Sequence, residues 1–452
     1  MKQFKDPFPR VAFLMLFIIA SCDVTLSQGQ RPNIIYVMVD DMGFADLSSF
    51  GRTDYQTPNI DAFVKEGIKF NNAYAGAPVC TPTRVAFMTG RYPARNAIGL
   101  REPLTGSPYD MTIGLSPDVP TVSSILKQNG YETALFGKWH LGVNEKFAPW
   151  KHGFDHFFGI LSGAADYADH RVIDRNAALL VKRKGSFLYE NDKPIDKPGY
   201  LTDLITDYST AFIRQAHAKP FFLSIQYTSP HWPWQRPNDK PTADTIPYDQ
   251  DADPEIFREM VRNLDANFGK IIAAVKSAGL ETSTLIIFTS DNGGEKYSNM
   301  GPYKGNKMTL WEGGIRVPAA VRWPGVIAPA QQSDQPVITM DWTVTILDAS
   351  SAKYPDTLQF DGISLLSHFR DPEKTTPRKF YWRLSNRTKQ EAYRTGDWKY
   401  LRTAEGEFLF NLADDPYETK NLKNQMHEKF NALKAAFAIS NEQMLPPLVL
   451  SH

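Results

Sequence analysis

The stretch NIIYVMVDD, residues 33–41, decides the fold of this chain. Its run NIIYVMV is short, apolar and rich in β-branched residues, which predicts a buried strand. Similar runs follow at 131–137 (YETALFG), 220–227 (PFFLSIQY) and 284–290 (TLIIFTS), and helical patterns lie at 57–67, 121–129, 201–217 and 254–279. Alternating strands and helices predict an α/β fold, with a large mixed, mostly parallel sheet flanked by helices on both faces.

The pattern changes after about residue 375. KFYWRLSN, EAYRTGDWKYLR and EFLFNL predict short antiparallel strands, with Thr-Gly-Asp as a turn. A final helix is expected around 424–437. We therefore predict a large α/β domain over 30–375 and a smaller C-terminal α+β domain over 376–452.

Residues 1–29 resemble a signal peptide. Basic residues precede the apolar run VAFLMLFIIA (11–20), which is too short to span a bilayer. The segment IASC (19–22) also resembles a bacterial lipobox, in which Cys22 would become the lipidated first residue. The alternative is ordinary cleavage near Gln28 or Gly29. Both readings predict export: to the periplasm, to the cell surface if Cys22 is lipidated, or into the medium.

The overall charge argues against one class of partner. Lys and Arg number 50, as do Asp and Glu, so the formal net charge is zero. A broad nucleic-acid-binding surface needs a basic excess, so none is expected, and membrane contact is expected only through a lipid anchor. A local pocket for an anion remains compatible with this balance.

Oxygen-bearing side chains follow two of the predicted strands. Asp40 and Asp41 come directly after the first strand, and Asp291 and Asn292 follow TLIIFTS. The carboxyl ends of parallel strands share one edge of a sheet, and adjacent buried carboxylates repel unless a cation neutralises them. Such oxygens favour Ca²⁺ or Mg²⁺, whereas zinc sites usually contain more His or Cys. The alternative is that they are polar loop starts, with Asp-Asn-Gly-Gly as a plain turn.

Cys80 has no expected disulfide partner, because the other cysteine, Cys22, lies in the signal segment. Thr81 and Pro82 predict a helix with Thr81 as N-cap, so Cys80 should lie just outside a helix N-terminus that attracts negative charge. Arg84 in the first turn indicates an anionic neighbour. Cys80 is therefore a candidate nucleophile, although a buried, small apolar role is the alternative.

These residues resemble a known family. Cys80-Thr81-Pro82-Thr83-Arg84 matches the Cys-x-Pro-x-Arg signature of the type I, formylglycine-dependent sulfatases, and GYETALFGKWHLG (130–142) matches their second signature. Further segments resemble sulfatases: SPHWP (229–233), DNGG (291–294), EGGIRVP (312–318) and LFNLADDPYETKNL (409–422). The pattern is more similar to exported polysaccharide sulfatases and N-acetylgalactosamine-6-sulfate sulfatase than to enzymes for small aryl esters.

The resemblance implies an alkaline-phosphatase-like fold and a formylglycine mechanism. A maturation enzyme would oxidise Cys80 to Cα-formylglycine, whose hydrate attacks sulfur and then expels sulfate. Asp40, Asp41, Asp291 and Asn292, together with residue 80, would hold one Ca²⁺. The resemblance also implies that the remaining catalytic residues are Arg84, Lys138, His140, His231 and Lys307, of which Lys138, His231 and Lys307 also bind the sulfate. Lys304 is the alternative to Lys307.

Two further residues, Tyr167 and His170 in ADYADH (165–170), could line the substrate pocket, and a plain loop is the alternative.

The expected function is hydrolysis of O-sulfate esters on a carbohydrate. A marine algal polysaccharide of the ulvan, carrageenan or fucoidan type, or its oligosaccharides, is the leading substrate, followed by a glycosaminoglycan. One alternative is a phosphomonoester or phosphonate hydrolase of the same superfamily. Another is an inactive homologue that only binds glycans.

Overall fold

The computed structural model describes Met1 and residues 31–105, 110–171, 188–241, 253–385 and 388–448. Contacts divide the chain into two units, Met1–Gln30 and Arg31–His452, and every helix and strand of the described residues lies in the second. The predicted signal segment, with Cys22, falls outside the described residues apart from Met1.

A ten-stranded sheet forms the centre of the second unit. Its strands are β1 (Asn33–Val39), β2 (Ile68–Phe70), β4 (Glu132–Lys138), β5 (His156–Ile160), β6 (Leu188–Glu190), β7 (Lys193–Ile195), β8 (Phe221–Gln226), β9 (Thr284–Ser290), β10 (Ala319–Arg322) and β11 (Gln331–Ser333). They lie in the order β11-β2-β10-β9-β1-β8-β4-β5-β6-β7. The strands from β9 to β5 are parallel, whereas β10 and β6 pair antiparallel with their neighbours. The predicted mixed, mostly parallel sheet is confirmed.

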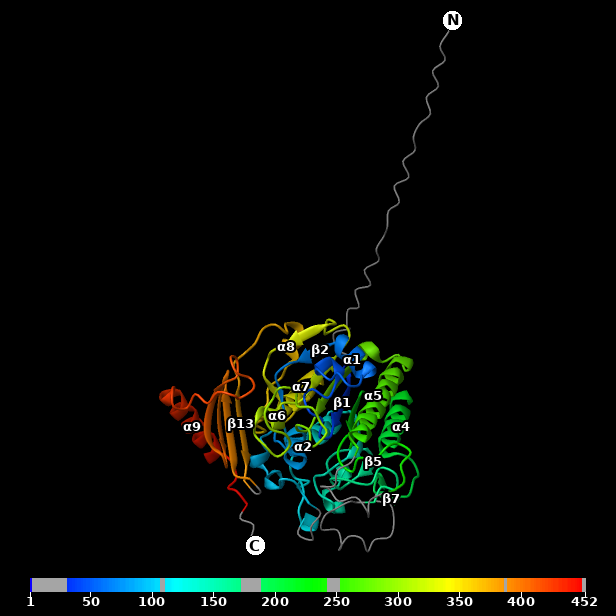
Figure 1. Cartoon of the computed structure of the whole chain (residues 1–452). Helices are drawn as coiled ribbons and strands as arrows, with labels where there is room; N and C mark the ends of the chain where they lie inside the picture. Colours follow the sequence, from blue (N-terminus) through cyan, green and yellow to red (C-terminus); the bar gives the residue numbers. More distant parts are fainter. Residues whose placement is uncertain (2–30, 106–109, 172–187, 242–252, 386–387, 449–452) are drawn as a thin grey trace. The chain divides into compact units, whose positions relative to one another are not determined.

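Both faces of the central strands are buried under helices (Figure 1). Alternate residues of β1, beginning with Ile35, pack in a layer with α1 (Pro58–Lys65), α4 (Leu201–Arg214) and α5 (Pro254–Ser277). The intervening residues, beginning with Ile34, pack with α2 (Cys80–Thr89), α3 (Val122–Gln128), α7 (Thr339–Ala349) and α8 (Leu366–Arg370). Burial on both faces explains why these strands are continuous apolar runs in the sequence.

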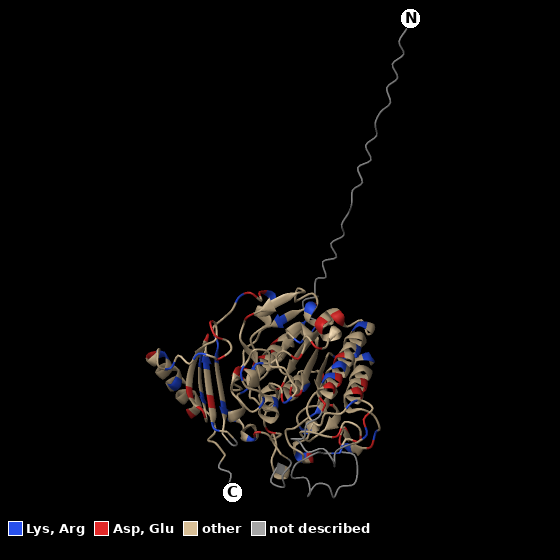
Figure 2. Ribbon diagram, in the orientation of Figure 1, with Lys and Arg blue, Asp and Glu red and all other residues tan. Residues whose placement is uncertain are grey.

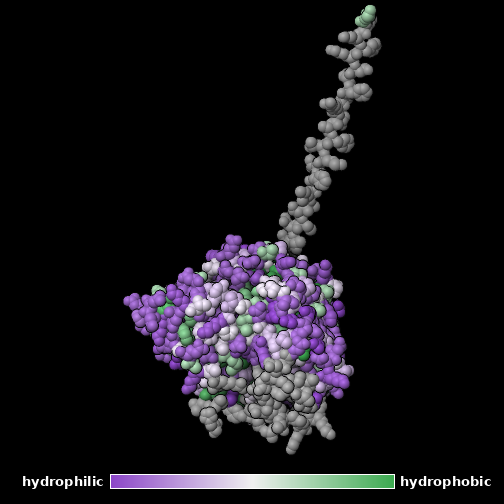
Figure 3. Space-filling view, in the orientation of Figure 1, coloured by the Kyte–Doolittle hydropathy of each residue, from purple (hydrophilic) through white to green (hydrophobic). Residues whose placement is uncertain are grey.

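The charged residues of α5 lie among apolar ones in a helical pattern, and Figure 2 shows both signs of charge along this helix. Its buried positions include Phe257, Leu264 and Ile271, which recur on one face. Figure 3 shows a visible face that is mostly hydrophilic, with scattered hydrophobic residues. Among the helices of the described residues, none combines the length and the apolar character needed to cross a membrane.

The C-terminal segment forms a second, antiparallel sheet of β13 (Lys379–Leu384), β14 (Gln390–Thr395), β15 (Trp398–Thr403) and β16 (Gly406–Asn411). One face packs on α9 (His427–Glu442) through residues such as Tyr400 and Phe437. The other face, with Trp382 and Phe410, packs on Tyr74 of the larger body. The predicted antiparallel sheet is confirmed. The final helix begins three residues later than expected, because the backbone N–H groups of 425 and 426 bond to the Leu422 carbonyl in turns.

The other elements are short. The strands β3 (Ala73–Tyr74) and β12 (Val337–Ile338) pair in parallel, and α6 covers Glu312–Ile315. Turns of 3₁₀ helix lie at Ser48–Phe50, Pro93–Arg95, Ala97–Leu100, Asp110–Thr112, Glu145–Phe147, Pro149–Lys151 and Glu281–Ser283. The proposed domain boundary at 375 falls between α8 and β13, and it stays a prediction.

A buried charge network joins the C-terminal sheet to the rest of the unit. Lys399 of β15 is fully buried, and its Nζ lies 2.8 Å from Glu312 and 2.7 Å from Glu418. Glu418 also accepts a hydrogen bond from the Glu312 backbone N–H (2.7 Å). Burial raises the pKa of Glu418 to about 7, so this carboxyl is costly to ionise without its lysine.

We expect Lys399→Met to lower the free energy of unfolding by about 3–5 kcal/mol, because the buried Glu418 loses the cation beside it and Glu312 loses one cation while keeping Arg316 at 2.9 Å. Urea denaturation measures this. The matched control is Lys423→Met, since Lys423 is partly exposed and lies 3.5 Å from Glu407; its effect should stay below about 1 kcal/mol. Equal small losses in both variants would contradict the role given to Lys399.

Candidate active site

The acidic ends of β1 and β9 lie side by side, as the sequence predicts. Val39 is paired with Ser290 at the end of both strands, so Asp40 and Asp291 follow at the same edge of the sheet. The Asp41 backbone N–H donates to Asp291 Oδ1 (3.2 Å), and Asn292 Nδ2 donates to Asp41 Oδ1 (2.7 Å). The structure thus brings together the four predicted cation ligands that follow these two strands.

The donor atoms of this cluster fit a hard cation. Asp40 Oδ1 and Asn292 Oδ1 are buried without a hydrogen-bond partner, which is costly unless something else contacts them. Ligand atoms of Asp40, Cys80 and Asp291 lie within 4.8 Å of one another, as do those of Asp40, Asp41 and His231. A site dominated by carboxylate and amide oxygens suits Ca²⁺ or Mg²⁺ better than zinc.

Three cationic side chains surround the acids. Lys138 Nζ lies 2.5 Å from Asp40, and Lys307 Nζ lies 2.6 Å from Asp41. Arg84 Nη2 lies 2.8 Å from Asp291 and 3.6 Å from Asp40. All three cations are buried, so each of them places positive charge against the aspartates without intervening water.

These charges affect both the acids and the ligand that the site can take. Burial and repulsion by Asp40 raise the pKa of Asp291 to about 7, against the pull of Arg84. At Asp41 burial is outweighed by Lys307 and His231, which lower its pKa to about 2. A bound divalent cation would therefore leave a net positive site, which favours an anionic ligand.

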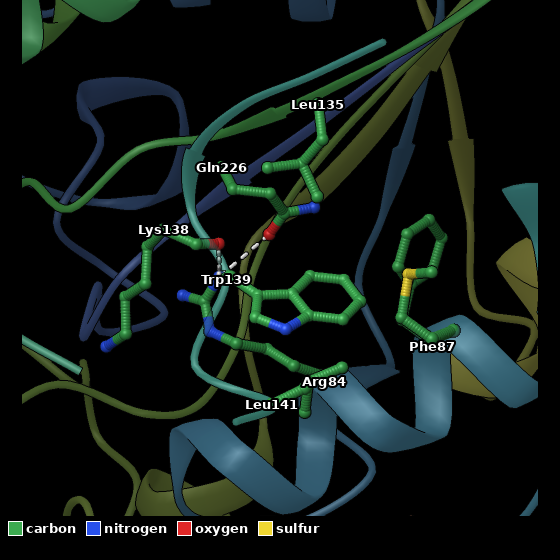
Figure 4. A pocket seen from close by; sticks show the side chains of 8 residues that line it. Arg84, Phe87, Leu135, Lys138, Trp139, Leu141 and Gln226 are labelled. Carbon is green, nitrogen blue, oxygen red and sulfur yellow. Dashed lines mark hydrogen bonds between the residues drawn. The ribbon is translucent and has the colours of Figure 1, made fainter. Parts of the chain in front are cut away.

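Arg84 also makes hydrogen bonds to two groups other than the aspartates. Its Nη1 donates to Gln226 Oε1 (2.8 Å) and to the Lys138 carbonyl (3.4 Å). Figure 4 shows Arg84 extended toward both groups, beside a small pocket whose walls include Phe87 and Trp139. These contacts hold the guanidinium in place beside the carboxylates of Asp40 and Asp291.

Cys80 is the first residue of α2, and the N-cap is Val79, so the prediction that Thr81 caps this helix is wrong. Thr81 Oγ1 accepts a hydrogen bond from the Leu104 N–H (3.2 Å) and donates to the His140 carbonyl (3.4 Å). Its hydroxyl therefore bonds to other segments of the chain instead of capping α2. Burial raises the pKa of the Cys80 thiol to about 11, although Lys138 and Lys307 lower it. The unmodified thiol therefore stays protonated at neutral pH.

His140 and His231 lie at the same edge as buried, neutral rings. Burial and the nearby lysines lower the pKa of His231 to about 3, and they hold that of His140 well below its usual value. His231 Nδ1 bonds to the Trp232 carbonyl, which leaves Nε2 facing Asp41 at 3.5 Å. His140 Nε2 bonds to the Leu104 carbonyl (3.0 Å), and its buried Nδ1 has no hydrogen-bond partner.

Tyr167 and His170 are both buried, and only Tyr167 has a described contact with a loop of the site. The Tyr167 hydroxyl contacts the carbonyls of Thr228 (2.8 Å) and His231 (2.9 Å), so it supports the loop that carries His231. His170 Nε2 bonds to the Gly199 carbonyl (2.9 Å). Direct contact of either side chain with a substrate stays a prediction.

The structure separates the two candidate lysines. Lys307 lies in the cluster, whereas the Lys304 ammonium lies 3.5 Å from the centre of the Trp311 ring and 3.6 Å from Glu405. Lys304 is also about half exposed. This placement favours Lys307 as the lysine at the site.

The sulfatase family profile matches residues 32–352, well over half of the chain. The chain belongs to the sulfatase family. A second profile, "N-sulphoglucosamine sulphohydrolase, C-terminal", matches residues 304–442. The resemblance seen in the sequence is confirmed, and it groups the chain with the sulfuric ester hydrolases.

Curated relatives include N-acetylgalactosamine-6-sulfatase from Rattus norvegicus, which is 34% identical over 351 residues. That alignment covers 75% of this chain and 65% of the rat protein, slightly under two thirds of its length. N-acetylgalactosamine-6-sulfatase from Homo sapiens is 31% identical over 369 residues, covering 78% of this chain and 69% of that protein.

Solved structures show the same fold. The crystal structure of Ps i-CgsB in complex with k-i-k-neocarrahexaose has a TM-score of 0.82 and 29% identity, covering 92% of this chain and 94% of that one. The PsFucS1 sulfatase from Pseudoalteromonas sp. has a TM-score of 0.73 and 26% identity, covering 94% and 93%. The predicted sulfatase fold is confirmed.

Two residues of this sulfatase site were missed in the sequence. Gln226, which holds Arg84, ends β8 at the same sheet edge as Asp40, so the rule that found the acids could have found it. Glu295 lies 3.6 Å from Lys307. It follows the Asp-Asn-Gly-Gly turn, and no motif marked it.

We expect Ca²⁺ to stabilise metal-stripped protein by about 2.7 kcal/mol at 100 times its dissociation constant, because a ligand that binds only the folded state stabilises that state. Thermal unfolding and calorimetry measure this. Asn292→Ala should weaken Ca²⁺ binding by about tenfold or more, since a buried ligand oxygen is lost. Asn299→Ala is the control, because its side chain accepts from the Gly301 N–H (2.8 Å). An unfolding temperature that does not change when Ca²⁺ is added would contradict the predicted cation site.

Proposed function

We propose that this chain hydrolyses O-sulfate esters on a carbohydrate. The observation that carries the proposal is the placement of residue 80 against an oxygen-donor cluster and two buried lysines. Such a pocket combines a nucleophile position with positive charge for a group that is anionic in the ground state and gains negative charge on the leaving oxygen.

We further propose that Cys80 is converted to Cα-formylglycine by a maturation enzyme. The pKa of the thiol, about 11, makes unmodified Cys80 a poor nucleophile at neutral pH. The hydrated aldehyde would supply a hydroxyl that attacks sulfur, and its second hydroxyl would allow the sulfated residue to break down. The start of α2 favours negative charge at this position.

The chain's own side chains divide the remaining work. Asp40, Asp41, Asp291 and Asn292, together with residue 80, would hold one Ca²⁺, which when bound supplies charge neutralisation and Lewis-acid polarisation of the sulfate. Lys138 and Lys307 would bind sulfate oxygens in place of part of their present contacts with the acids. Arg84 lies beside the carboxylates of Asp40 and Asp291 and would support the hydrated aldehyde at residue 80.

The two histidines would handle protons at the leaving oxygen. A bound sulfate ester adds negative charge beside the rings and opposes the fall in their pKa values. His231 Nε2 faces the cluster, because Nδ1 bonds to the Trp232 carbonyl, so it is the better placed donor to the departing alcohol. His140 would assist this proton transfer.

The proposed substrate is a sulfated algal polysaccharide or its oligosaccharides. A carrageenan-type glycan is favoured because Ps i-CgsB, with a TM-score of 0.82, was solved with k-i-k-neocarrahexaose. Fucoidan and ulvan types are next, followed by a glycosaminoglycan, as the relatives named N-acetylgalactosamine-6-sulfatase suggest. We also propose that the chain is exported; the N-terminal residue of the mature protein tests this, since lipidation would make it Cys22.

We expect protein coexpressed with a formylglycine-generating enzyme to release inorganic sulfate from defined carrageenan oligosaccharides. Mass spectrometry of the residue-80 peptide verifies the conversion, and Cys80→Ala should fall to background. Faster turnover of matched phosphate or phosphonate esters would favour the phosphohydrolase alternative. Glycan binding without turnover by converted protein would favour the inactive homologue, and activity confined to aryl sulfates would overturn the carbohydrate assignment.

Lys307→Ala should lower kcat/KM for the sulfate ester by about 10²–10³, the usual loss for one preorganised charge donor. Lys304→Ala is the matched control, because Lys304 lies over Trp311 and outside the cluster. Steady-state kinetics on the same substrate compare them. A larger loss in the Lys304 variant would reverse the assignment.

A further inference from the structure

The side chain of Gln390, at the start of β14, clamps the loop that carries Lys307. Gln390 Oε1 accepts from the Leu310 N–H (2.9 Å), and Gln390 Nε2 donates to the Met308 carbonyl (3.0 Å). Nε2 also donates to Thr388 Oγ1 (2.7 Å). Because a backbone N–H only donates and a carbonyl only accepts, these contacts fix the orientation of the amide. Gln390 is 5% exposed, so water competes little for them.

The clamped residues adjoin Lys307 directly. Met308 has a positive φ of 69°, a backbone conformation that residues other than glycine adopt only at a cost. Its N–H donates to the Pro78 carbonyl (2.8 Å), two residues before Cys80. The Lys307 N–H donates to the Gly294 carbonyl (3.0 Å), just after Asn292. The backbone around Lys307 therefore connects the residue-80 segment, the cation ligands and the C-terminal sheet.

Lys307 depends on these contacts because it lies between β9 and α6, in a segment without helix or strand. Its ammonium nevertheless lies 2.6 Å from Asp41. A long lysine side chain reaches one place only when its backbone is fixed, and an error of about 1 Å at a reacting centre can cost about 10²-fold in rate.

We propose that Gln390 of the C-terminal sheet is a positioning residue that sets Lys307 for the sulfate group. The proposal rests on the proposed function for the role of Lys307. It gives the C-terminal sheet a part in the reaction, through the contacts of one amide with the Met308 carbonyl and the Leu310 N–H.

The test variant is Gln390→Met, which fills a similar volume but makes neither hydrogen bond. Its neighbour Glu391 provides the control, because in a strand adjacent side chains point to opposite faces, and Glu391 pairs with Arg402. We expect Gln390→Met to raise KM for the sulfate ester and the inhibition constant of inorganic sulfate together, each by about tenfold or more. Glu391→Gln should change neither by more than about twofold.

A double-mutant cycle with Lys307→Ala shows whether Gln390 acts through Lys307. In that background, Gln390→Met should cause no further loss of kcat/KM, whereas a general effect on folding would add its full loss. The crystal structure of Gln390→Met gives a readout that needs no activity: Lys307 should leave Asp41, at 2.6 Å in the native chain.

The outcomes separate the two proposals. If converted wild-type protein cleaves no sulfate ester, the proposed function fails, and the crystal structure of Gln390→Met still decides whether Gln390 places Lys307. If the wild type is active and Gln390→Met matches it within about twofold, Gln390 has no positioning role. A variant structure in which Lys307 keeps its contact with Asp41 overturns the inference whatever the rates.

Discussion

The site depends on the electrostatic compensation of three aspartates crowded at one edge of a buried sheet. Two parallel strands end in register, so Asp40 and Asp291 must lie together, and their repulsion is strong where water is excluded. Arg84, Lys138 and Lys307 supply the compensation without a metal. In the proposed function these cations would become free to contact an anionic ester when the aspartates hold a divalent ion. One arrangement thus accounts for folding of the site and for its choice of ligand.

The strands and the acidic ligands could be predicted from the sequence where the local residue pattern and the sheet topology indicate the same structure. Because β1 and β9 are buried on both faces, they are continuous apolar runs that predict strands. Parallel pairing of such strands then predicts that their acidic ends lie together. The cap of α2 could not be predicted, because Thr81 bonds to the loop of Leu104, far away in sequence. Gln226 was overlooked although it ends β8 at the same sheet edge, whereas Glu295 gains its place in the site through a contact with Lys307 that only the folded chain creates.

The C-terminal sheet belongs to the active site as much as to the stability of the unit. Lys399 joins it to Glu312, the first residue of α6, and the Gly293 N–H donates to the Gly314 carbonyl at 3.0 Å. The sheet therefore supports the Gly-Gly turn beside Asn292. It also reaches the residue-80 segment, since Leu384 packs in one cluster with Val79, Cys80 and Met308. A truncation before β13 would remove these contacts together.

The complete burial of α2 has a consequence for the timing of biosynthesis. Cys80 and Arg84 are hidden in the folded unit, and the partners Met308 and Leu384 that cover Cys80 emerge from the ribosome more than about 200 residues later. At about 5–20 residues per second, this delay is roughly ten seconds or more. Under the proposed maturation, the oxidising enzyme would have to reach Cys80 before these distant segments are made, and a molecule that folds first would retain the unmodified thiol.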